Sequence, residues 1–441
     1  MARVGPERRG STGAARPRLA PDGRLIGLAV ATGLVALAAG AIVHGGAGRN
    51  PRPQRPSQRE LVVGPARVAV PVAASPHSGG RLAAAAPSLL AARNAYRALN
   101  LHFGASHGLF NKYADTPRYA GAWAVAQAME GAVDLGKLPA GGVSRQQIRR
   151  LFAALRFYWD PAARPPGYDK LVRPPLGPGG YKFYDDNALI GLSLVRAYEA
   201  TGDPAMLTRA AQVFQFEKSG WDRRRSHAFP GGIFWKQSPD THDRNTVSTA
   251  AAAELGLHLY LLSGQHSYLR WAERMYDWVN RTFRAPNGLY WDHVDLRGRI
   301  SRQQWSYNQG FMLGCDELLY RATGRRRFLS GAQRIAARSL ARYRRSGLDS
   351  QRPILDAIFF RNLLALGQLV PDRGYIRAAE AYARYLSHHV NADGLLQVNP
   401  RPFLLDQAAL LQVSAYIALE RLGLPIDSVM AGWPPLRWPT W

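Results

Sequence analysis

A glycine that ends a helix recurs at a nearly constant interval in this chain. Three copies of a Tyr-x-x-x-Gly motif end at Gly202, Gly264 and Gly324, which lie 62 and then 60 residues apart, and a second apolar-periodic segment follows each. Glycine just past a helix end is a common stop signal, because it adopts the left-handed backbone conformation without strain. A fixed period with one helical hairpin in each repeat indicates a repeat architecture.

Helical spacing of apolar residues continues through almost the whole chain after residue 84. Twelve helices are expected, near residues 85–102, 117–132, 145–159, 185–201, 204–218, 245–263, 267–283, 304–323, 326–343, 352–370, 374–390 and 405–422. Patterns typical of strands are scarce. We predict an all-α fold in which six helical hairpins close as a two-layered ring, an (α/α)6 barrel. An open superhelix is the alternative.

The first 83 residues have a different composition from the rest. Residues 1–24 are basic and are expected to form a cytoplasmic leader, and residues 25–43 contain no charge. This stretch is long enough to span a bilayer, and the preceding arginines orient its N-terminus to the cytoplasm. A signal peptide cleaved at Ala39-Gly40-Ala41 is the competing interpretation. Residues 44–83, rich in Pro, Gly and Arg, predict a disordered linker. The domain at 84–441 is thus expected outside the cytoplasm, anchored to the membrane or secreted.

The formal net charge is +26, and only six of the 57 basic residues are lysines. The positive charge is spread along the sequence, without a zinc knuckle, an aromatic RNA-binding motif or a helix-turn-helix. We therefore expect no nucleic-acid partner. The charge is compatible with attraction to an anionic surface, such as lipid head groups or a phosphorylated polymer.

Two adjacent carboxylates, Asp185 and Asp186, stand where the Gly/Pro-rich loop 173–180 becomes a helix. Aspartate at this position is ordinarily a helix cap. Two carboxyl groups are also what glycoside hydrolysis requires, about 5–5.5 Å apart for retention of configuration or about 6.5–9.5 Å apart for inversion. Adjacent side chains leave a helix about 100° apart, so the shorter separation is within reach if both face a cleft. Their mutual repulsion would separate their pKa values.

Aromatic, amide and carboxylate side chains gather at the start of the first helix of each expected hairpin. In a ring these positions share one end, where they would line one cleft. Aromatic faces and a few directed polar groups suit sugar binding, although core packing is the alternative for each aromatic. The candidate substrate-binding residues are Tyr184, Asn187, Trp235, Asn245, Thr246, Trp305, Tyr307, Asn308 and Gln309. The polar loop with Asp240, His242 and Asp243 lacks further ligands at set spacing, so no metal site is predicted.

Several motifs in fixed order resemble glycoside hydrolase family 76, the endo-α-1,6-mannanases. They are Tyr184-Asp-Asp-Asn-Ala-Leu-Ile-Gly-Leu192, Gly231-Gly-Ile-Phe-Trp235, Asn245-Thr-Val-Ser248 and Trp305-Ser-Tyr-Asn-Gln-Gly310, and the similarity covers residues 90–423. The resemblance implies an (α/α)6 fold and a retaining mechanism through a covalent glycosyl-enzyme. It makes Asp185 the nucleophile and Asp186 the general acid/base, and places Asn245, Trp305, Tyr307 and Asn308 along the substrate groove. It implies no metal and no cofactor.

Two departures accompany this resemblance. Leu189 stands where the family usually has Trp, and Thr249-Ala-Ala stands where it often has Asn-Ala-Pro. The expected function is a retaining glycosidase, acting as a monomer, that cleaves α-1,6-mannosidic linkages in a cell-envelope mannan or mannosylated glycolipid. The alternatives are a transglycosidase that remodels an envelope glycan, a non-catalytic glycan-binding protein with the same fold, and a helical scaffold held at the membrane.

Overall fold

The computed structural model describes residues 78–427, which contain twelve α-helices and nine short β-strands. The helices are α1 (Ser78–Phe103), α2 (Ala122–Lys137), α3 (Arg145–Ala154), α4 (Tyr184–Thr201), α5 (Pro204–Ser219), α6 (Thr246–Ser263), α7 (His266–Phe283), α8 (Ser306–Thr323), α9 (Arg326–Ser346), α10 (Pro353–Leu369), α11 (Arg373–Ser387) and α12 (Leu404–Leu422). The strands are β1 (Asn111–Tyr113), β2 (Thr116–Tyr119), β3 (Trp159–Asp160), β4 (Gly167–Tyr168), β5 (Lys182–Phe183), β6 (Lys236–Gln237), β7 (Asp243–Asn245), β8 (His293–Asp295) and β9 (Ile300–Ser301).

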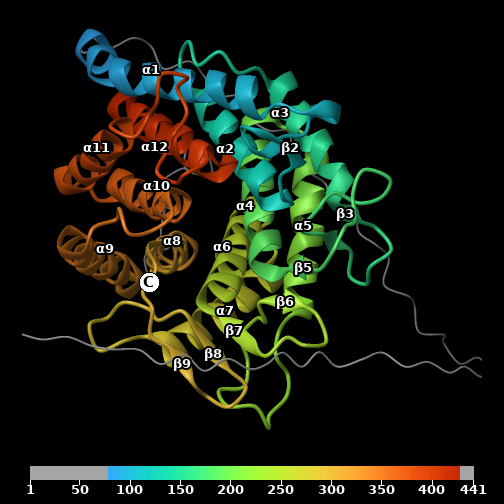
Figure 1. The fold of residues 1–441 in the computed structure, drawn as a ribbon. Coiled ribbons are helices and arrows are strands. Elements are labelled where there is room, and N and C mark those ends of the chain that lie inside the picture. Colours follow the sequence, from blue (N-terminus) through green and yellow to red (C-terminus); the bar gives the residue numbers. More distant parts are fainter. Residues whose placement is uncertain (1–77, 428–441) are drawn as a thin grey trace, which may run out of the picture. The chain divides into compact units, whose positions relative to one another are not determined.

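The even-numbered helices form a closed inner ring (Figure 1). Each of them packs against the next, from α2 through α4, α6, α8 and α10 to α12, and α12 packs against α2. The odd-numbered helices cover this ring from outside, each against an inner partner. The packing agrees with the expected closed, two-layered arrangement rather than with an open superhelix.

The sixth pair of helices differs from the prediction of six hairpins. Five pairs are consecutive hairpins, from α2 with α3 to α10 with α11, but α12 takes α1 as its outer partner. The two ends of the described chain therefore form the last pair together. Helix α1 also begins at Ser78, so the prediction of a linker is wrong for residues 78–83. The alanine run at 83–86 has high helix propensity, which favours extension of this helix.

Three glycines end inner helices as predicted. Gly202, Gly264 and Gly324 have φ angles of 71°, 68° and 68°, in the left-handed region. Each backbone N–H donates a hydrogen bond of 2.7 Å to the carbonyl of the tyrosine four residues earlier. This bond satisfies one of the carbonyls that a helix end leaves free, and the chain then turns into the outer helix.

Burial differs between the two layers. In α6 every residue from Thr246 to Leu259 is buried, because inner helices have neighbours on all sides. Outer helices such as α7 and α11 bury one stripe and expose the opposite face, the usual pattern of a surface helix. Inner helices approach closely: a Cβ added at Gly310 of α8 would lie 2.8 Å from the Cα of Phe359 in α10.

Short strands precede the inner helices and replace parts of two predicted helices. Strand β2 occupies part of the predicted helix 117–132, and α2 starts only at Ala122, after Pro117 and the N-cap Gly121. The predicted helix 145–159 ends at Ala154 and continues as a 3₁₀ turn and strand β3. The strands pair as β1–β2, β3–β4, β5–β6 and β7–β8–β9, all antiparallel. Their pairing fixes the loops from which the candidate site is built.

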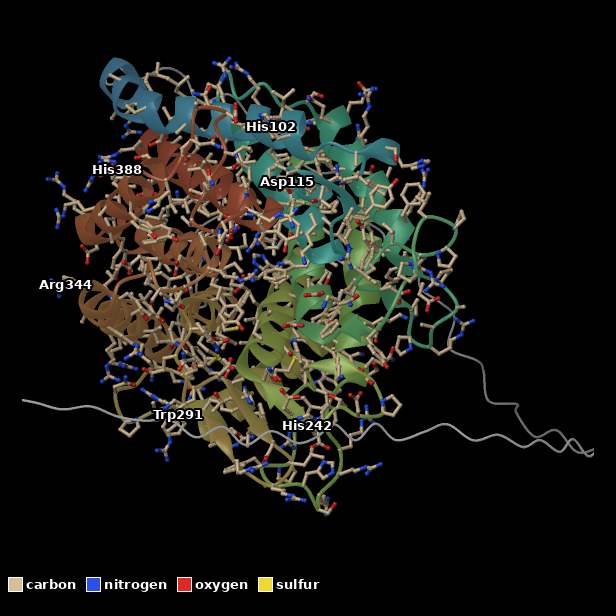
Figure 2. All side chains as sticks on the ribbon, in the orientation of Figure 1. His102, Asp115, His242, Trp291, Arg344 and His388 are labelled. Atoms are coloured by element: carbon tan, nitrogen blue, oxygen red, sulfur yellow. The ribbon has the colours of Figure 1, made fainter. Side chains whose placement is uncertain are left out.

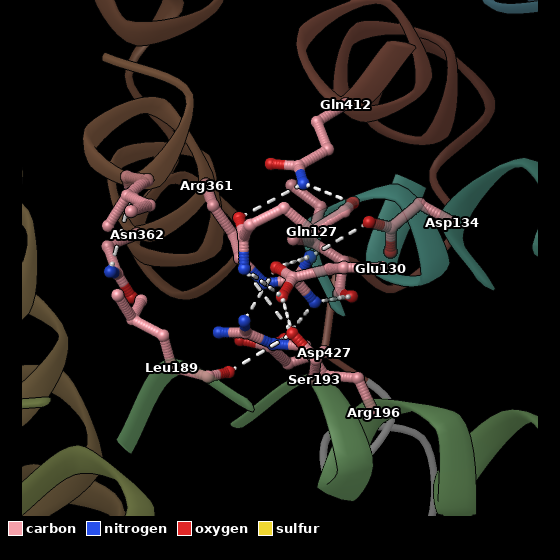
Figure 3. A network of polar contacts seen from close by, with 12 residues as sticks. Gln127, Glu130, Asp134, Leu189, Ser193, Arg196, Arg361, Asn362, Gln412 and Asp427 are labelled. Carbon is pink, nitrogen blue, oxygen red and sulfur yellow. Dashed lines mark hydrogen bonds and ion pairs between the residues drawn. The ribbon is translucent and has the colours of Figure 1, made fainter. Parts of the chain in front are cut away.

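A buried polar network ties the inner helices together (Figure 3). Arg361 of α10 contacts Asp134 of α2 at 3.0 Å and Asp427 at 2.6 Å. Arg196 of α4 contacts Glu130 of α2 at 2.6 Å and Glu254 of α6 at 3.3 Å. Buried guanidinium groups need such partners, because an unpaired charge in the interior is very costly. The network therefore joins four inner helices with the segment that follows α12.

The predicted leader 1–24, the predicted membrane segment 25–43 and most of the predicted linker lie outside the described residues. Between residues 78 and 427, none of the helices combines the length and apolarity that crossing a bilayer requires.

Candidate active site

Asp185 and Asp186 lie in the first turn of α4, as predicted, with half-buried side chains. Strand β5 leads into this helix and pairs with β6, which brings Trp235 beside the start of α4. The Tyr184 N–H donates to the carbonyl of Trp235 at 2.9 Å. The indole Nε1–H of Trp235 donates to Oδ2 of Asp185 at 3.2 Å, and the N–H of Asp186 donates to Oδ1 of Asp185 at 2.9 Å. One carboxylate of the pair thus accepts two hydrogen bonds.

The environment raises the pKa of both carboxyls. Burial raises the pKa of Asp185 well above its ordinary range, and the charge of Asp186 raises it further. Burial raises the pKa of Asp186 to about 6, although the ammonium group of Lys170 opposes this change. Repulsion makes two such carboxyls release their protons in separate steps. The two donors on Asp185 lower its pKa and offset part of this rise.

Lys170 is a feature of this site that the sequence did not reveal. It lies in the loop after β4, and its Nζ is 4.8 Å from the centre of the Phe183 ring. Its backbone N–H donates to the carbonyl of Tyr181 and its carbonyl accepts from the N–H of Ala122. These bonds link this loop to α2 and to the residue before β5. Nothing in the sequence motif around residue 170 indicates that its charge acts on Asp186.

Tyr307 and Asn308 of α8 lie at the same site as the aspartate pair. Burial raises the pKa of Tyr307 well above its ordinary range, and the charges of Asp292 and Asp185 both add to the rise. Asn308 Nδ2 donates to Asp292 Oδ1 at 3.2 Å, and His293 Nδ1 lies 2.9 Å from Asp292 Oδ2. The first turn of α8 and the loop before β8 therefore bring a third carboxylate, Asp292, towards the pair.

Several buried polar atoms around the starts of the inner helices have no hydrogen-bond partner among the described residues. Among them are Nε1 of Trp123, Oδ1 of Asn245 and Oδ1 of Asn308. Buried polar atoms are rarely left unbonded, so such atoms indicate places where a polar ligand or water binds. Asn245 ends strand β7 opposite His293, which places its amide beside the Asp292 group. Trp305 is the half-buried N-cap residue of α8, and Trp235 is 39% exposed.

Three predicted substrate-binding residues have a different role in the structure. Asn187 is fully buried; its Oδ1 accepts from the Tyr168 N–H at 2.7 Å, and its Nδ2 donates to two backbone carbonyls. Gln309 is likewise buried and bonded to the backbone of Tyr290 and Trp305. The hydroxyl of Thr246 donates to the carbonyl of Trp291 at 2.6 Å. Their polar groups hold loops, so the prediction that they contact substrate does not agree with the structure.

Tyr184 is also placed differently. Its side chain is 5% exposed and its ring stacks on Phe216, with centroids 4.6 Å apart. The ring packs in the interior against Phe216 of α5 and not beside the aspartates. The physical reason is that Tyr184 points towards α5, where Gly220 leaves room for its ring: a Cβ on Gly220 would lie 2.6 Å from it.

At the fourth residue of four inner helices, the side chain bonds the backbone of a loop, an arrangement that we call a backbone clasp. Asn187, Gln309 and Gln407 each use a side-chain amide to bond the N–H and carbonyl groups of loop segments, and Thr249 accepts from the Ile233 N–H at 2.9 Å. Buried loop backbone needs such partners. The clasps therefore position the loops that carry the candidate site.

Glu217 of α5 is a buried carboxyl that the sequence did not single out. Its side chain is fully buried, and neither carboxyl oxygen has a hydrogen-bond partner among the described residues. Burial raises its pKa well above the ordinary range, and the charge of Asp185 raises it further. The environment of Glu217 therefore favours its neutral form, and Glu217 lies close enough to Asp185 for their carboxylate charges to repel each other.

The polar loop before β7 borders a cavity that Tyr184 also lines. Asp240 forms an ion pair of 2.8 Å with Lys236, and His242 Nδ1 contacts the backbone carbonyl of Asp240 at 3.0 Å. His242 is exposed and is labelled in the lower part of Figure 2.

The sequence profile of Glycosyl hydrolase family 76 matches residues 92–359, more than half of the chain. The chain belongs to glycoside hydrolase family 76. Two curated relatives are mannan endo-1,6-alpha-mannosidases of yeasts. The protein of Candida glabrata is 30% identical over 165 residues, which is 34% of this chain and 36% of the relative. The protein of Candida albicans is 33% identical over 164 residues, with the same shares. The matched region is thus about a third of each relative's length.

Solved family 76 structures share the fold. An α-mannanase of Bacteroides thetaiotaomicron has a TM-score of 0.68 at 19% identity, over 75% of this chain and 95% of that chain. An α-1,6-mannanase of Salegentibacter has a TM-score of 0.63 at 22% identity, over 76% and 99%. The latter is an inactive variant with two consecutive aspartates replaced by asparagine, in complex with α-1,6-mannotriose.

Leu189, which departs from the usual family 76 residue, is 4% exposed and belongs to the hydrophobic core. The side chain at this position packs inside the ring in this family member. Thr249, the first residue of the second departure, forms the clasp to Ile233 described above.

Proposed function

We propose that this chain is a retaining glycosidase with the (α/α)6 fold that cleaves α-1,6-mannosidic linkages. The observation that carries the proposal is the adjacent carboxyl pair at the start of α4. Asp185 accepts two hydrogen bonds, and burial raises the pKa of Asp186 to about 6. The names of the curated relatives support the linkage type, and the mannotriose complex of the Salegentibacter enzyme supports a mannooligosaccharide substrate.

In this proposal Asp185 is the nucleophile. Its carboxylate attacks the anomeric carbon, and the glycosidic bond to the leaving sugar breaks as the new C–O bond forms. The donors on Asp185 hold one orientation of the carboxylate for this attack. Asp186 gives its proton to the departing oxygen, because a general acid works best with a pKa near the working pH. Asp186 then takes a proton from the water that releases the sugar from Asp185.

Trp235, Asn245, Trp305, Tyr307 and Asn308 are the proposed substrate-binding residues. The exposed part of the Trp235 indole offers an apolar face to a pyranose ring while its N–H remains on Asp185. The unpaired Oδ1 atoms of Asn245 and Asn308 would accept hydrogen bonds from sugar hydroxyls.

The proposed setting is the cell envelope. Residues 25–43 would anchor the enzyme to the membrane or direct its secretion, and residues 84–441 would act outside the cytoplasm on a mannan or a mannosylated glycolipid. We propose that it acts as a monomer and needs neither metal nor cofactor.

The test is hydrolysis of α-1,6-mannan oligosaccharides by the full-length protein, beside the variants Asp185→Asn, Asp186→Asn and the exposed control Asp393→Asn. We expect shorter oligomers from wild type and from the control, and none from either site variant. With an aryl α-mannoside, whose leaving group needs no general acid, azide added to an Asp186→Ala variant should yield a mannosyl azide of retained α configuration, because azide needs no general base. Oligomers longer than the substrate would identify transfer instead of hydrolysis. Unchanged oligomers with wild type would refute the proposed substrate.

A further inference from the structure

A cavity lies between α7, α8 and α9, outside the proposed active site. Its volume is about 300 Å³. Its lining comes from the second half of α7, the loop after it, the middle of α8 and the first half of α9: Tyr276, Asp277, Asn280, Arg284, Gly288, Tyr290, Asp316, Arg327, Phe328, Gly331, Arg334 and Ile335. No residue of the aspartate pair or of its proposed substrate contacts is among them.

The floor of this cavity is formed by buried polar side chains that are hydrogen-bonded to one another. Asp316 of α8 is 2% exposed, and the hydroxyl of Tyr276 donates a hydrogen bond to it. Gly331 of α9 passes directly over this carboxyl, since a Cβ there would lie 2.3 Å from Asp316 Oδ2. Asn280 accepts a hydrogen bond of 2.8 Å from the Tyr290 hydroxyl. The floor thus offers oxygen and amide groups that suit hydroxyls of a ligand.

The walls carry a surplus of positive charge. Arg284, Arg327 and Arg334 line the cavity, and within residues 78–427 none of the three has a carboxylate at ion-pair distance. Burial raises the pKa of Asp316 to about 7, and the charges of all three arginines oppose this rise. A fourth guanidinium, of Arg338, lies against Gly288: a Cβ there would be 1.4 Å from its Nη1. Asp277 and Asp316 are the only acidic residues among those that line the cavity.

We propose that this cavity binds a phosphorylated saccharide. Three guanidinium groups around one cavity, one from the end of α7 and two from α9, match a phosphate better than a planar carboxylate that one arginine satisfies, because a phosphate presents three oxygens and up to two negative charges. The phosphate would lie between Arg284, Arg327 and Arg334. The sugar would lie against Asp316 and Asn280, with the aromatic ring of Tyr276 beside it. This site is distinct from the proposed mannan-cleaving site and does not depend on it.

The test is calorimetric titration of the full-length protein with mannose 6-phosphate, with mannose and inorganic phosphate as separate titrants. We expect saturable binding of mannose 6-phosphate, weaker binding of phosphate and none of mannose at the same concentration. The double variant Arg327→Ala/Arg334→Ala should bind the sugar phosphate about tenfold or more weakly for each guanidinium removed.

The matched control removes two arginines of the same helix that do not line the cavity, Arg326→Ala/Arg344→Ala (Figure 2). Its affinity should equal that of wild type. Equal loss in both double variants would show that overall basic charge binds the anion, which overturns the site. Binding only to vesicles of phosphatidylglycerol, or no binding of the sugar phosphate, would also overturn it.

A folding defect is separated from a binding defect by the single charge reversal Arg334→Glu, which changes an exposed side chain. Its thermal midpoint should stay near that of wild type while the affinity falls at least as far as for the removal of one guanidinium. Full affinity in this folded variant would contradict the proposal.

Discussion

Trp235 and Asp185 are 50 positions apart in the chain, and the indole of Trp235 donates a hydrogen bond of 3.2 Å to the Asp185 carboxylate. Pairing of β5 with β6 makes this contact, because it seats residues 182–183 against 236–237. The loop between α5 and α6 therefore holds the proposed nucleophile at the start of α4.

Replacing Trp235 with Phe tests this contact. The variant keeps an aromatic face but loses the donor, and a hydrogen bond to a charged group contributes about 1.5–3 kcal/mol. We expect kcat/KM on the α-1,6-linked substrate to fall by roughly tenfold to a hundredfold, with little change in thermal midpoint because the side chain is partly exposed. Wild-type kcat/KM in this variant would mean that the indole N–H does not assist the nucleophile.

The charge of Lys170 should set the alkaline limit of activity. Burial raises the pKa of Asp186 to about 6 while Lys170 lowers it, so removing Lys170 raises the pKa further. A general acid must be protonated, and activity therefore falls as the pH rises through this pKa. We expect Lys170→Met to move the descending limb of the kcat/KM–pH profile to higher pH. Lys236→Met, which breaks an exposed ion pair with Asp240, should leave that limb in place.

The backbone clasps should contribute to stability rather than to substrate contact. Asn187→Ala removes three buried hydrogen bonds to backbone groups, which we expect to cost about 2–4 kcal/mol of unfolding free energy. Gln309→Ala should behave in the same way. The exposed control Gln333→Ala on α9 should change stability by less than about 0.5 kcal/mol. Denaturant unfolding measures all three, and an unaltered midpoint for Asn187→Ala would refute the structural role.

Glu217 should make stability depend on pH. Its folded-state pKa lies well above the ordinary value of 4.5, so the unfolded chain releases this proton at a lower pH than the folded protein. Stability from the neutral carboxyl is fully present below about pH 4.5 and is lost as the pH rises towards the folded pKa. Glu217→Gln should remove this slope and gain stability relative to wild type at neutral pH. Glu273→Gln on α7 is the matched control; equal slopes in both variants would show that Glu217 ionises freely.

The regular part of the fold was predictable because its signals are local. Gly202, Gly264 and Gly324 end helices where the sequence predicts, since a left-handed residue and a following amphipathic segment suffice to define the hinge. The position of Asp185 and Asp186 at a helix start follows from the Gly/Pro-rich loop before them. The two-residue strands were not predictable, because pairs such as Phe183 with Lys236 depend on a partner far along the chain.

The roles of the amides were hidden for a related reason. Asn187 and Asn308 stand at neighbouring positions of equivalent helices, the fourth and the third, and look alike in the sequence. Asn187 faces the loop backbone, and Asn308 faces Asp292. Their positions in the two helices differ by one residue, which turns the side chain by about 100° around the helix axis. Glu217 gave no signal, because in the sequence a buried carboxyl looks like any other charged residue of an amphipathic outer helix.

The pairing of α1 with α12 has a consequence for how this protein matures. A ribosome releases α1 first and α12 last among the twelve helices. The apolar side of α1, with Leu99 and Phe103, therefore has no partner until nearly the whole domain has been synthesised. Closure of the ring is a long-range event, which makes folding slow and leaves an unfinished chain prone to association. A permuted gene that joins α12 directly to α1 and opens the ring elsewhere would make this last pair a local hairpin.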